Sequence, residues 1–550
     1  MRIKLLFVFF FLALASPALI AQTNDECTGA VPLTVSEDAA CRNEVTGDAA
    51  GATKSLGAIN CEGSMGIPDD VWYSFVASNT SHIITVKGSA DFDAVIDLRM
   101  GSCPGVNIAC SDASYTGGTS EVLFASDLIV GNTYYVRVYN WSGSYAATST
   151  FTICITTPKE IDSPCDRAKM VNDYNLLYKS SEVLESQLNW TGNTANCDAG
   201  EISEVAQQNV LTRINYYRKL VGLPQNISFD PALANKCQEA ALMMHANNEL
   251  SHTPPTTWSC YTADGAQAAS KSNIASSHST KAIDAYINDN GSNNAAVGHR
   301  RWILYSKANI FGHGSTSKYD ALWVLGTTVP AFDIDYVAYP SAGFFPAPLV
   351  PTSNRWSFAK VGADFTNTTI EMSDSSGTPI SLTQEPIAKG YGDNTIVWKP
   401  TGIFTNSETD IPYTVHVKNV VVSGISHDYT YVVKISQPVY PPKCPEGYAW
   451  SENDCACSAT LTSNRPENYS SSVYISPNPA NNYVNLSFDS KVNIQKAFVT
   501  LYDISGRKVG AYTIQSNTAR IDLSNINNGL YYIIVEENNK QYQSKIIINK

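Results

Sequence analysis

Apolar and polar residues alternate over short segments between residues 22 and 157, with Gly, Asn, Ser and Asp between the segments. Strands with one buried face show this two-residue period. The segments are residues 71–75, 82–86, 94–98, 134–138 and 151–155. The pattern predicts an antiparallel β-sandwich over residues 22–157.

The period of the apolar residues changes to that of a helix after residue 157, and residues 158–200 are predicted to form a helical linker. Helical and strand patterns follow at residues 205–222, 230–244, 279–288, 309–312 and 321–326. Asp230-Pro231 is a favourable helix start, because Asp caps well and Pro suits the first helical position. Helices around a small sheet predict an α+β unit over residues 201–332.

Strand patterns return after residue 332. Residues 333–440 contain aromatic and β-branched runs between turn residues, and they are predicted to form an immunoglobulin-like β-sandwich. Residues 441–473 are rich in Cys, Pro and Ser and are predicted to be a linker. The remainder, residues 474–550, is predicted to be another β-sandwich.

The first residues indicate export. Arg2 and Lys4 precede an apolar run at residues 5–15, which small residues and Pro17 follow. This order is that of a secretory signal peptide, predicted over residues 1–21. The run is shorter than the roughly 20 residues that span a bilayer, and no later segment qualifies, so we expect no transmembrane segment.

Composition indicates several domains and argues against one class of partner. The chain has 550 residues, 43% of them hydrophobic and 16% charged, and it exceeds the length at which a single core keeps growing. Its formal net charge is −13. We expect no nucleic acid partner, because phosphate binding needs clustered Lys and Arg.

Thirteen cysteines predict disulfides, which persist in oxidising compartments. They fall into local groups: Cys27, Cys41, Cys61, Cys103, Cys110 and Cys154; Cys165 and Cys197; Cys237 and Cys260; and Cys444, Cys455 and Cys457. We expect Cys165 and Cys197 to staple the helical linker, and the odd total to leave one cysteine unpaired. The last group offers three sulfur ligands without a nearby His, which argues against zinc there.

Two histidines of the α+β unit are the main candidates for a functional site. His252 lies in Leu250-Ser251-His252-Thr253, and His299 lies in Gly298-His299-Arg300-Arg301-Trp302. The remaining histidines of this unit are interpreted as surface or hydrogen-bonded residues: His245, His278 and His313. We interpret Gly312-His313-Gly314 as a tight strand end.

The motifs around these histidines occur in the order found in the CAP superfamily, the family of cysteine-rich secretory, antigen 5 and pathogenesis-related 1 proteins. The motifs are residues 209–223, 229–233, 240–244, 250–253, 272–275, 282–287 and 298–304. The unit resembles the bacterial branch of this family. The resemblance implies an α-β-α sandwich whose central cleft is framed by two histidines and two acidic residues, which in some members hold a divalent metal.

When the cleft positions of the family are transferred to this sequence, the resemblance implies that His252, Asp289 and His299 lie in the cleft. The second acidic position falls on Ser272, where the family usually has Glu. Two imidazoles can ligate zinc or a similar ion, and a carboxylate can orient one of them. Serine at this position weakens both metal affinity and general-base capacity. The residues after His299 are expected to support the cleft wall: Arg300, Arg301 and Trp302.

A serine nucleophile is an alternative for the same residues. Ser272 would attack, His252 or His299 would act as base, and Asp289 would orient the base. Ser272 lacks the strained turn that presents such a nucleophile, and it lies in a stretch rich in serine. The sequence therefore argues against this triad.

The N-terminal sandwich resembles the accessory domains of secreted bacterial hydrolases, of the pre-peptidase C-terminal type. The resemblance rests on the phrases at residues 70–75, 91–95 and 131–138. Several acidic residues there are candidate calcium ligands: Asp69, Asp70, Asp91, Asp93 and Asp97. Their spacing is not that of an EF-hand, and Asp is common in turns, which favours capping and solvation instead.

The last 77 residues, 474–550, closely resemble the type A C-terminal sorting domain of the type IX secretion system of Bacteroidetes. The motifs are Ser476-Pro477-Asn478-Pro479-Ala480, Leu501-Tyr502-Asp503-Ile504-Ser505-Gly506 and Gly529-Leu530-Tyr531-Tyr532. The resemblance implies interaction with the secretion machinery, passage through the periplasm, and release or attachment at the outer cell surface.

We therefore expect an exported multidomain CAP protein that binds an extracellular peptide, lipid or glycan in a His-lined cleft without strong catalysis of its own. Two alternatives stay open. One is a metal-assisted hydrolase or peptidase that uses His252, Asp289 and His299, with the two histidines as zinc ligands. The other is a lipid or sterol carrier, since the CAP resemblance includes such proteins.

Overall fold

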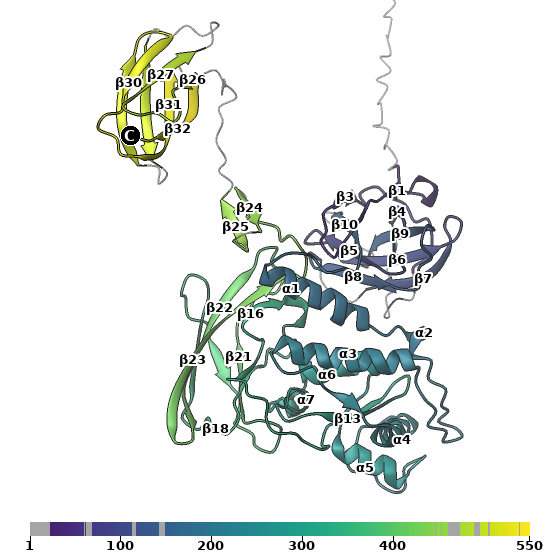
Figure 1. Ribbon diagram of the computed structural model, residues 1–550. Helices are drawn as coiled ribbons and strands as arrows, with labels where there is room; N and C mark the ends of the chain where they lie inside the picture. The colour runs from purple at the N-terminus through teal and green to yellow at the C-terminus, as the bar shows by residue number, and fades with distance from the viewer. Residues whose placement is uncertain are drawn as a thin grey trace, which may run out of the picture. The chain divides into compact units, whose positions relative to one another are not determined.

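The computed structural model describes residues 23–550 except 60, 62–68, 113–116, 142–148, 446, 453, 460–472, 489–495, 504–506 and 538–539. The chain divides into two compact units, one of Met1–Pro445 with Ala449–Ser458 and the other of Ala459–Lys550 with Glu446–Tyr448. Strands dominate near both ends of the chain, and helices gather in its middle (Figure 1). The predicted signal peptide, residues 1–21, lies outside the described residues.

The N-terminal module is a sandwich of two sheets, as the alternating pattern predicted. One sheet has the order β1 (Val31–Pro32), β4 (Asp70–Val76), β9 (Thr133–Asn140), β6 (Ala94–Met100) and β7 (Val106–Ser111). The other has the order β2 (Val35–Ser36), β10 (Thr150–Thr156), β5 (His82–Gly88) and β8 (Ser120–Ala125), with β3 (Val45–Asp48) paired to β10. Alternate residues such as Val71, Tyr73 and Phe75 face one buried core.

The central module is an α-β-α sandwich, which confirms the predicted fold class. Its sheet has the order β11 (Ser228–Phe229), β13 (Ile310–Ser315), β14 (Asp320–Trp323) and β12 (Ser272–Ala275). The helices are α3 (Glu204–Leu220), α4 (Pro231–Asn247), α5 (Ala263–Lys271), α6 (Ser279–Asn288) and α7 (Gly298–Ile303). Ala321 and Trp323 of β14 share a core with α4 and α5, whereas Leu322 shares one with α3 and α6. The sheet is therefore apolar on both faces.

Local sequence explains where these helices begin. Asp230 accepts a hydrogen bond from the backbone N–H of Leu233, and Pro231 occupies the first position of α4, as predicted. Ser203 caps α3 in the same way. The sequence pattern missed α5 and α7, because α5 is built mainly from small residues and α7 is only six residues long.

The module after residue 333 is a two-sheet sandwich that shares a core with the central module. One sheet is β15 (Val337–Tyr339), β17 (Trp356–Ala359), β21 (Thr395–Pro400) and β20 (Leu382–Gln384). The other is β16 (Gly343–Pro346), β23 (Ile425–Ser436), β22 (Ile411–Val422) and β18 (Ala363–Asp364), with β19 (Thr369–Ser373) paired to β22. Trp356 and Phe358 belong to the same buried cluster as Val210 of α3 and Ile283 of α6.

Two disulfides do not follow the local groups of cysteines. The helical linker contains α1 (Asp166–Asp173), a π-helical turn (Tyr174–Tyr178), a 3-10 turn (Lys179–Ser181) and α2 (Glu185–Leu188). Cys165, just before α1, bonds Cys455 between β24 (Tyr448–Ser451) and β25 (Ala456–Ala459), and Cys197 bonds Cys260. The expectation that Cys165 and Cys197 together staple the linker is therefore wrong. Pairing depends on distance in the fold, here 5.3 Å between Cα atoms of residues 290 apart in sequence.

The other cysteines follow the sequence more closely. The N-terminal group pairs within itself, as Cys27–Cys103, Cys41–Cys154 and Cys61–Cys110, and Cys444 bonds Cys457. The expected unpaired cysteine is Cys237, which is buried in α4.

The second unit is built from strands. One sheet has the order β26 (Val473–Ser476), β27 (Tyr483–Phe488) and β30 (Thr518–Asp522), and the other β29 (Lys508–Ile514), β28 (Ala497–Asp503), β31 (Gly529–Glu537) and β32 (Lys540–Ile548). Its core includes Leu486, Val499, Leu501 and Ile533. The unit therefore has a hydrophobic core of its own.

Candidate functional site

His252 lies in the loop after α4, and one hydrogen bond orients its ring. Its Nδ1 is 2.8 Å from the carbonyl oxygen of Ala269 in α5. A carbonyl only accepts, so Nδ1 donates, and Nε2 of the neutral ring keeps its lone pair. The side chain is exposed, and among the described residues Nε2 has no hydrogen-bond partner.

Asp289 and His299 form a hydrogen-bonded pair at the start of α7. Oδ1 of Asp289 accepts from Nδ1 of His299 at 2.7 Å, and Oδ2 accepts from the backbone N–H of His299 at 3.0 Å. Oδ2 also lies 3.4 Å from the backbone nitrogen of Arg300. Asp289 is 1% exposed, and both of its carboxylate oxygens are used in these hydrogen bonds to His299 and α7. The imidazole again presents Nε2.

Ser272, at the position where the family usually has Glu, turns its hydroxyl toward α4. Its Oγ lies 3.8 Å from Sγ of Cys237, and the residue is 6% exposed. Burial raises the pKa of the Cys237 thiol to about 12, so this sulfur is protonated at neutral pH. In the part of the chain that the structure describes, no histidine hydrogen-bonds to Ser272.

The structure brings His252, Ser272 and His299 together in one cleft of about 350 Å³. The other residues that line it are Ser270, Lys271, Asn273, Asn293, Asn294, Ala296, Gly298, Trp302, Val324, Leu325 and Tyr391. Asp289 lies behind His299 rather than in the cleft wall. Arg300 was expected to support the cleft wall. It is 1% exposed and donates to the carbonyl oxygens of Ile287 and Arg355, which agrees with a supporting position behind the cleft.

Sequence reasoning missed several of the lining residues. Asn293 and Asn294 lie in the turn between α6 and α7, where an Asn-rich run was the available signal. Trp302, expected to support the wall, lines the cleft itself. Tyr391 comes from the immunoglobulin-like module, in the loop between β20 and β21. The glycines on both sides of Tyr391 indicate a loop, but no sequence pattern indicates which module that loop contacts.

These residues do not fit a catalytic zinc site. Such a site uses three protein ligands and keeps a fourth position for water. Here Asp289 is bonded to His299 and α7, and the side chain of Ser272 faces Cys237, which leaves two imidazole nitrogens. Across the described ranges, no group of three or more His, Cys, Asp or Glu side chains is arranged to hold a metal.

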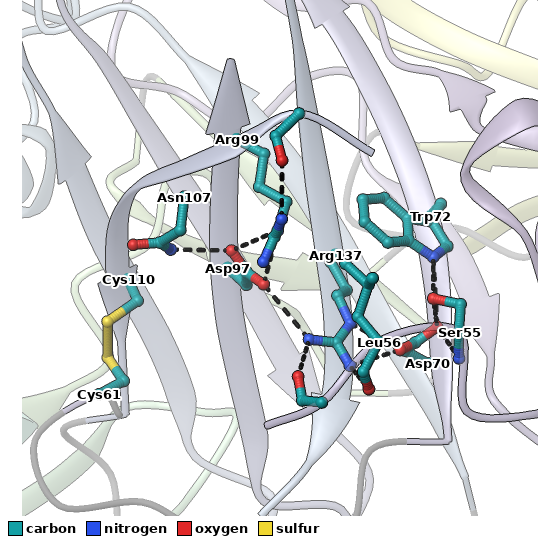
Figure 2. A network of polar contacts seen from close by, with 12 residues as sticks. Ser55, Leu56, Cys61, Asp70, Trp72, Asp97, Arg99, Asn107, Cys110 and Arg137 are labelled. Carbon is teal, nitrogen blue, oxygen red and sulfur yellow. Dashed lines mark hydrogen bonds and ion pairs between the residues drawn. A yellow bond between two sulfur atoms is a disulfide. The ribbon is translucent and has the colours of Figure 1, made fainter. Parts of the chain in front are cut away.

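Arginines engage two of the candidate calcium ligands in the N-terminal sandwich. Arg137 donates from Nε to Oδ2 of Asp70 at 2.6 Å and from Nη1 to Oδ2 of Asp97 at 3.3 Å (Figure 2). Arg99 donates to the same Asp97 oxygen at 3.0 Å. Because the side chains of Asp70, Asp97 and Arg137 are fully buried, guanidinium groups neutralise these carboxylates. Asp70 and Asp97 therefore do not fit a calcium site.

His313 is not at a strand end, which corrects the expectation for Gly312-His313-Gly314. It lies inside β13 and is 1% exposed; its Nε2 is 2.9 Å from Oδ2 of Asp320, and its Nδ1 bonds the side-chain oxygen of Gln207. A Cβ on Gly314 would lie 2.1 Å from the backbone nitrogen of Gln238 in α4. The glycines let α4 approach the sheet.

Three family models match the chain. The model for the cysteine-rich secretory protein family, CAP, matches residues 211–325, which include every residue of the cleft except Tyr391. A model described as galactose binding domain-like matches residues 23–153, and the secretion system C-terminal sorting domain matches residues 472–549.

The chain therefore contains a CAP domain between β-rich domains, as its sequence motifs predicted. It is an exported protein whose type IX sorting domain directs it, through the secretion machinery, to the cell surface or the extracellular space. In the portion of the chain described by the structure, no helix has the length and apolar character required to cross a membrane.

No curated protein matches the chain. Among solved structures, the pre-peptidase C-terminal domain of a collagenase from Bacillus anthracis is 16% identical, with 22% of this chain and 96% of that chain covered and a TM-score of 0.14. Dimeric latent PorU from Porphyromonas gingivalis is 12% identical, with 35% and 18% covered and a TM-score of 0.12. A Podospora anserina GH26-CBM35 β-(1,4)-mannanase is 10% identical, with 36% and 39% covered and a TM-score of 0.12.

Proposed function

We propose that this protein holds an extracellular ligand in its CAP cleft without catalysing a reaction on it. One observation carries the proposal: neither family acidic position supplies a reactive group to the cleft, because Asp289 is bonded to His299 and α7 while Ser272 faces Cys237. Nucleophilic hydrolysis by a side chain requires a nucleophile hydrogen-bonded to a base, and among the described residues neither serine of the cleft, Ser270 or Ser272, bonds a histidine. What it retains are polar groups suited to binding.

The β-rich modules have supporting roles in this proposal. The N-terminal sandwich, similar to a galactose binding domain-like family, serves adhesion or spacing. The domain boundaries at residues 22–157, 201–332, 333–440 and 474–550 are part of the same proposal. The sorting domain delivers the ligand-binding part to the cell exterior.

The test is binding of the full chain to a panel of soluble peptides, oligosaccharides and lipids, with products measured in parallel. We expect one class to bind, and its affinity to fall at least tenfold when His252 and His299 are both changed to Ala. The His427→Ala variant is the matched control, because His427 is an exposed histidine of β23. Binding that survives the double change would place the ligand elsewhere and refute the proposal.

A hydrolase is the second candidate, favoured by the Asp289–His299 pair. A carboxylate that orients an imidazole and leaves Nε2 open is the arrangement of a general base acting on water. Product formation by the wild-type chain that disappears in the double histidine variant would establish this candidate and overturn the binding proposal. Co-purified lipid, detected by extraction and mass spectrometry, would instead favour a carrier.

A further inference from the structure

Tyr391 belongs to the immunoglobulin-like module but lines the CAP cleft. Its loop is fastened to α7, the helix that carries His299. Nη1 of Arg301 donates to the carbonyl oxygen of Ala388 at 3.0 Å, and Nη2 donates to that of Asp393 at 3.0 Å. The Asp393 carboxylate accepts from the backbone N–H of Ser306 at 2.9 Å. The position of the loop is therefore fixed on both sides of Tyr391.

Two glycines allow this contact. Gly392 has a φ of +42°, and a Cβ there would lie 2.7 Å from the carbonyl oxygen of Arg301. A Cβ on Gly298 would lie 2.9 Å from the ring of Tyr391. The ring thus lies on the first turn of α7, at the residue that precedes His299, with the Arg301 guanidinium 5.4 Å from its centroid. The residue is still 39% exposed, so part of its ring is open to a ligand.

The charge of the cleft differs from that of the chain. The chain has a formal net charge of −13, yet no Asp or Glu is among the residues that line the cleft. Lys271 is among them, and it forms no ion pair within the described residues. A cation without a carboxylate partner, in a cleft without acidic groups, favours an anionic ligand.

The uncharged groups indicate the shape of that ligand. The aromatic residues Trp302 and Tyr391 and the amide residues Asn293 and Asn294 line the cleft. A sugar ring presents C–H groups on its faces and hydroxyls at its edge, so it can stack on the aromatic rings and hydrogen-bond to amides and imidazoles.

We propose that the cleft binds an acidic saccharide, and that Tyr391 is a specificity-determining residue that the immunoglobulin-like module supplies to the CAP domain. The ring of Tyr391 stacks on a sugar, the Nε2 atoms of the two histidines accept from its hydroxyls, and Lys271 pairs with its acid group. The proposal rests on the proposed function, because it uses the same cleft.

The experiment is calorimetric titration of the full chain with two probes, an oligogalacturonate and a sulfated heparin oligosaccharide, and with the neutral methyl ester of the first as its control. We expect at least one acidic probe to bind, and the ester to bind more weakly than the acid. We expect Tyr391→Ala to weaken binding about tenfold and Lys271→Ala about threefold. Tyr391→Phe keeps the ring and should bind within twofold of the wild type.

Matched variants separate a lost contact from a damaged loop. Tyr391→Leu fills much of the same space without an aromatic face, and Phe404→Ala removes an aromatic that is 68% exposed elsewhere in the same module. We expect Tyr391→Leu to weaken binding like Tyr391→Ala and Phe404→Ala to leave it unchanged. Wild-type affinity in Tyr391→Leu would overturn the role of Tyr391.

The outcomes also distinguish this inference from the proposed function. If neither acidic saccharide binds while an acidic peptide binds through His252 and His299, the saccharide class is wrong and the proposed function stands. If a saccharide binds with the same affinity after both histidines are changed to Ala, the cleft is not its site, and both proposals fail.

Discussion

At the scale of single residues, the hydrogen bonds at Nδ1 determine what the two cleft histidines present to a ligand. Nδ1 of His252 donates to a carbonyl oxygen, and Nδ1 of His299 donates to a carboxylate. In their neutral forms both rings therefore present Nε2 as an acceptor. The cleft thus selects ligand groups that donate hydrogen bonds to these nitrogens, such as hydroxyls.

Changing Asp289 to Asn should reverse this preference at His299. The side-chain oxygen of the asparagine can still accept from the backbone N–H groups at the start of α7. The NH₂ group of the asparagine then lies against Nδ1 of His299. We expect the neutral ring to move its proton to Nε2, which converts an acceptor into a donor. Nitrogen chemical shifts of the His299 imidazole at alkaline pH report the tautomer, and those of His252 serve as the control. An Nδ1–H tautomer in the variant would contradict this expectation.

Cys237 should be inert toward thiol reagents in the folded protein. The residue is fully buried, and burial raises the pKa of its thiol to about 12. Because the pH is far below this pKa, almost no thiolate is present at pH 8. We expect no alkylation by iodoacetamide over hours in the native state and one equivalent in denaturant. Stoichiometric labelling of the native chain would show that α4 opens.

At the scale of elements, β13 and β14 are held together by a buried polar network as well as by the sheet. His313 of β13 bonds Asp320 of β14, and the hydroxyl of Tyr286 in α6 donates to the same carboxylate at 3.0 Å. All three residues are buried. The network thus ties α6 to the sheet.

Removing one partner of this network should destabilise the central module. His313→Leu leaves a buried carboxylate without its imidazole, which costs about 3 kcal/mol of unfolding free energy. Urea unfolding of the full chain, followed by tryptophan fluorescence, measures the change. His427→Leu, at an exposed position of β23, should change the same quantity by less than about 0.5 kcal/mol. Equal effects of the two substitutions would contradict the role of the network.

The sequence predicted elements that are periodic and missed those that are short or polar. The apolar period located α3, α4 and α6, and Asp230 located the start of α4. The six-residue α7 carries no readable period, yet it positions His299. Gly312 and Gly314 were placed at a strand end, because the sequence does not reveal how closely α4 approaches the sheet.

The sequence indicated the histidines of the candidate site but not the cleft residue Tyr391. The histidine positions follow from motifs that lie within the CAP segment, and the structure places both in one cleft. Tyr391 is about ninety residues away from His299 and belongs to another module, so no local pattern connects the two. The direction of the Ser272 side chain, toward Cys237, depends on how α4 packs, and residue spacing in the sequence does not reveal it.

At the scale of the whole molecule, the CAP domain and the immunoglobulin-like module depend on a shared core. Tyr217 of α3 contacts Tyr339 of β15 with ring centroids 6.4 Å apart, and Arg300 donates to the hydroxyl oxygen of Ser357 in β17 at 3.2 Å. The apolar residues of both modules form one buried cluster. Cutting the chain between them exposes apolar surface.

We expect residues 201–332 alone to be less stable than residues 201–440. The shorter fragment loses the apolar surface that covers α3 and α6, so its melting temperature should fall by at least several degrees, or it should aggregate. Calorimetry of the two fragments measures the difference. Equal melting temperatures would mean that the CAP domain is independent of its neighbour.

The Cys165–Cys455 bond should stabilise the molecule more than the Cys444–Cys457 bond. It spans 290 residues rather than 13, and by chain entropy the longer loop gives about twice the stabilisation. We expect Cys165→Ser with Cys455→Ser to lower the melting temperature of the first unit more than Cys444→Ser with Cys457→Ser. The opposite order would contradict the entropic account.

The same bond sets an order of events during export. A chain delivered from its N-terminus presents Cys165 long before Cys455, so this native bond forms only after almost the whole first unit has crossed. A product truncated before Cys455 keeps Cys165 as an unpaired thiol just ahead of α1. A free thiol at Cys165, in addition to the buried one at Cys237, therefore identifies a chain in which the Cys165–Cys455 bond has not formed.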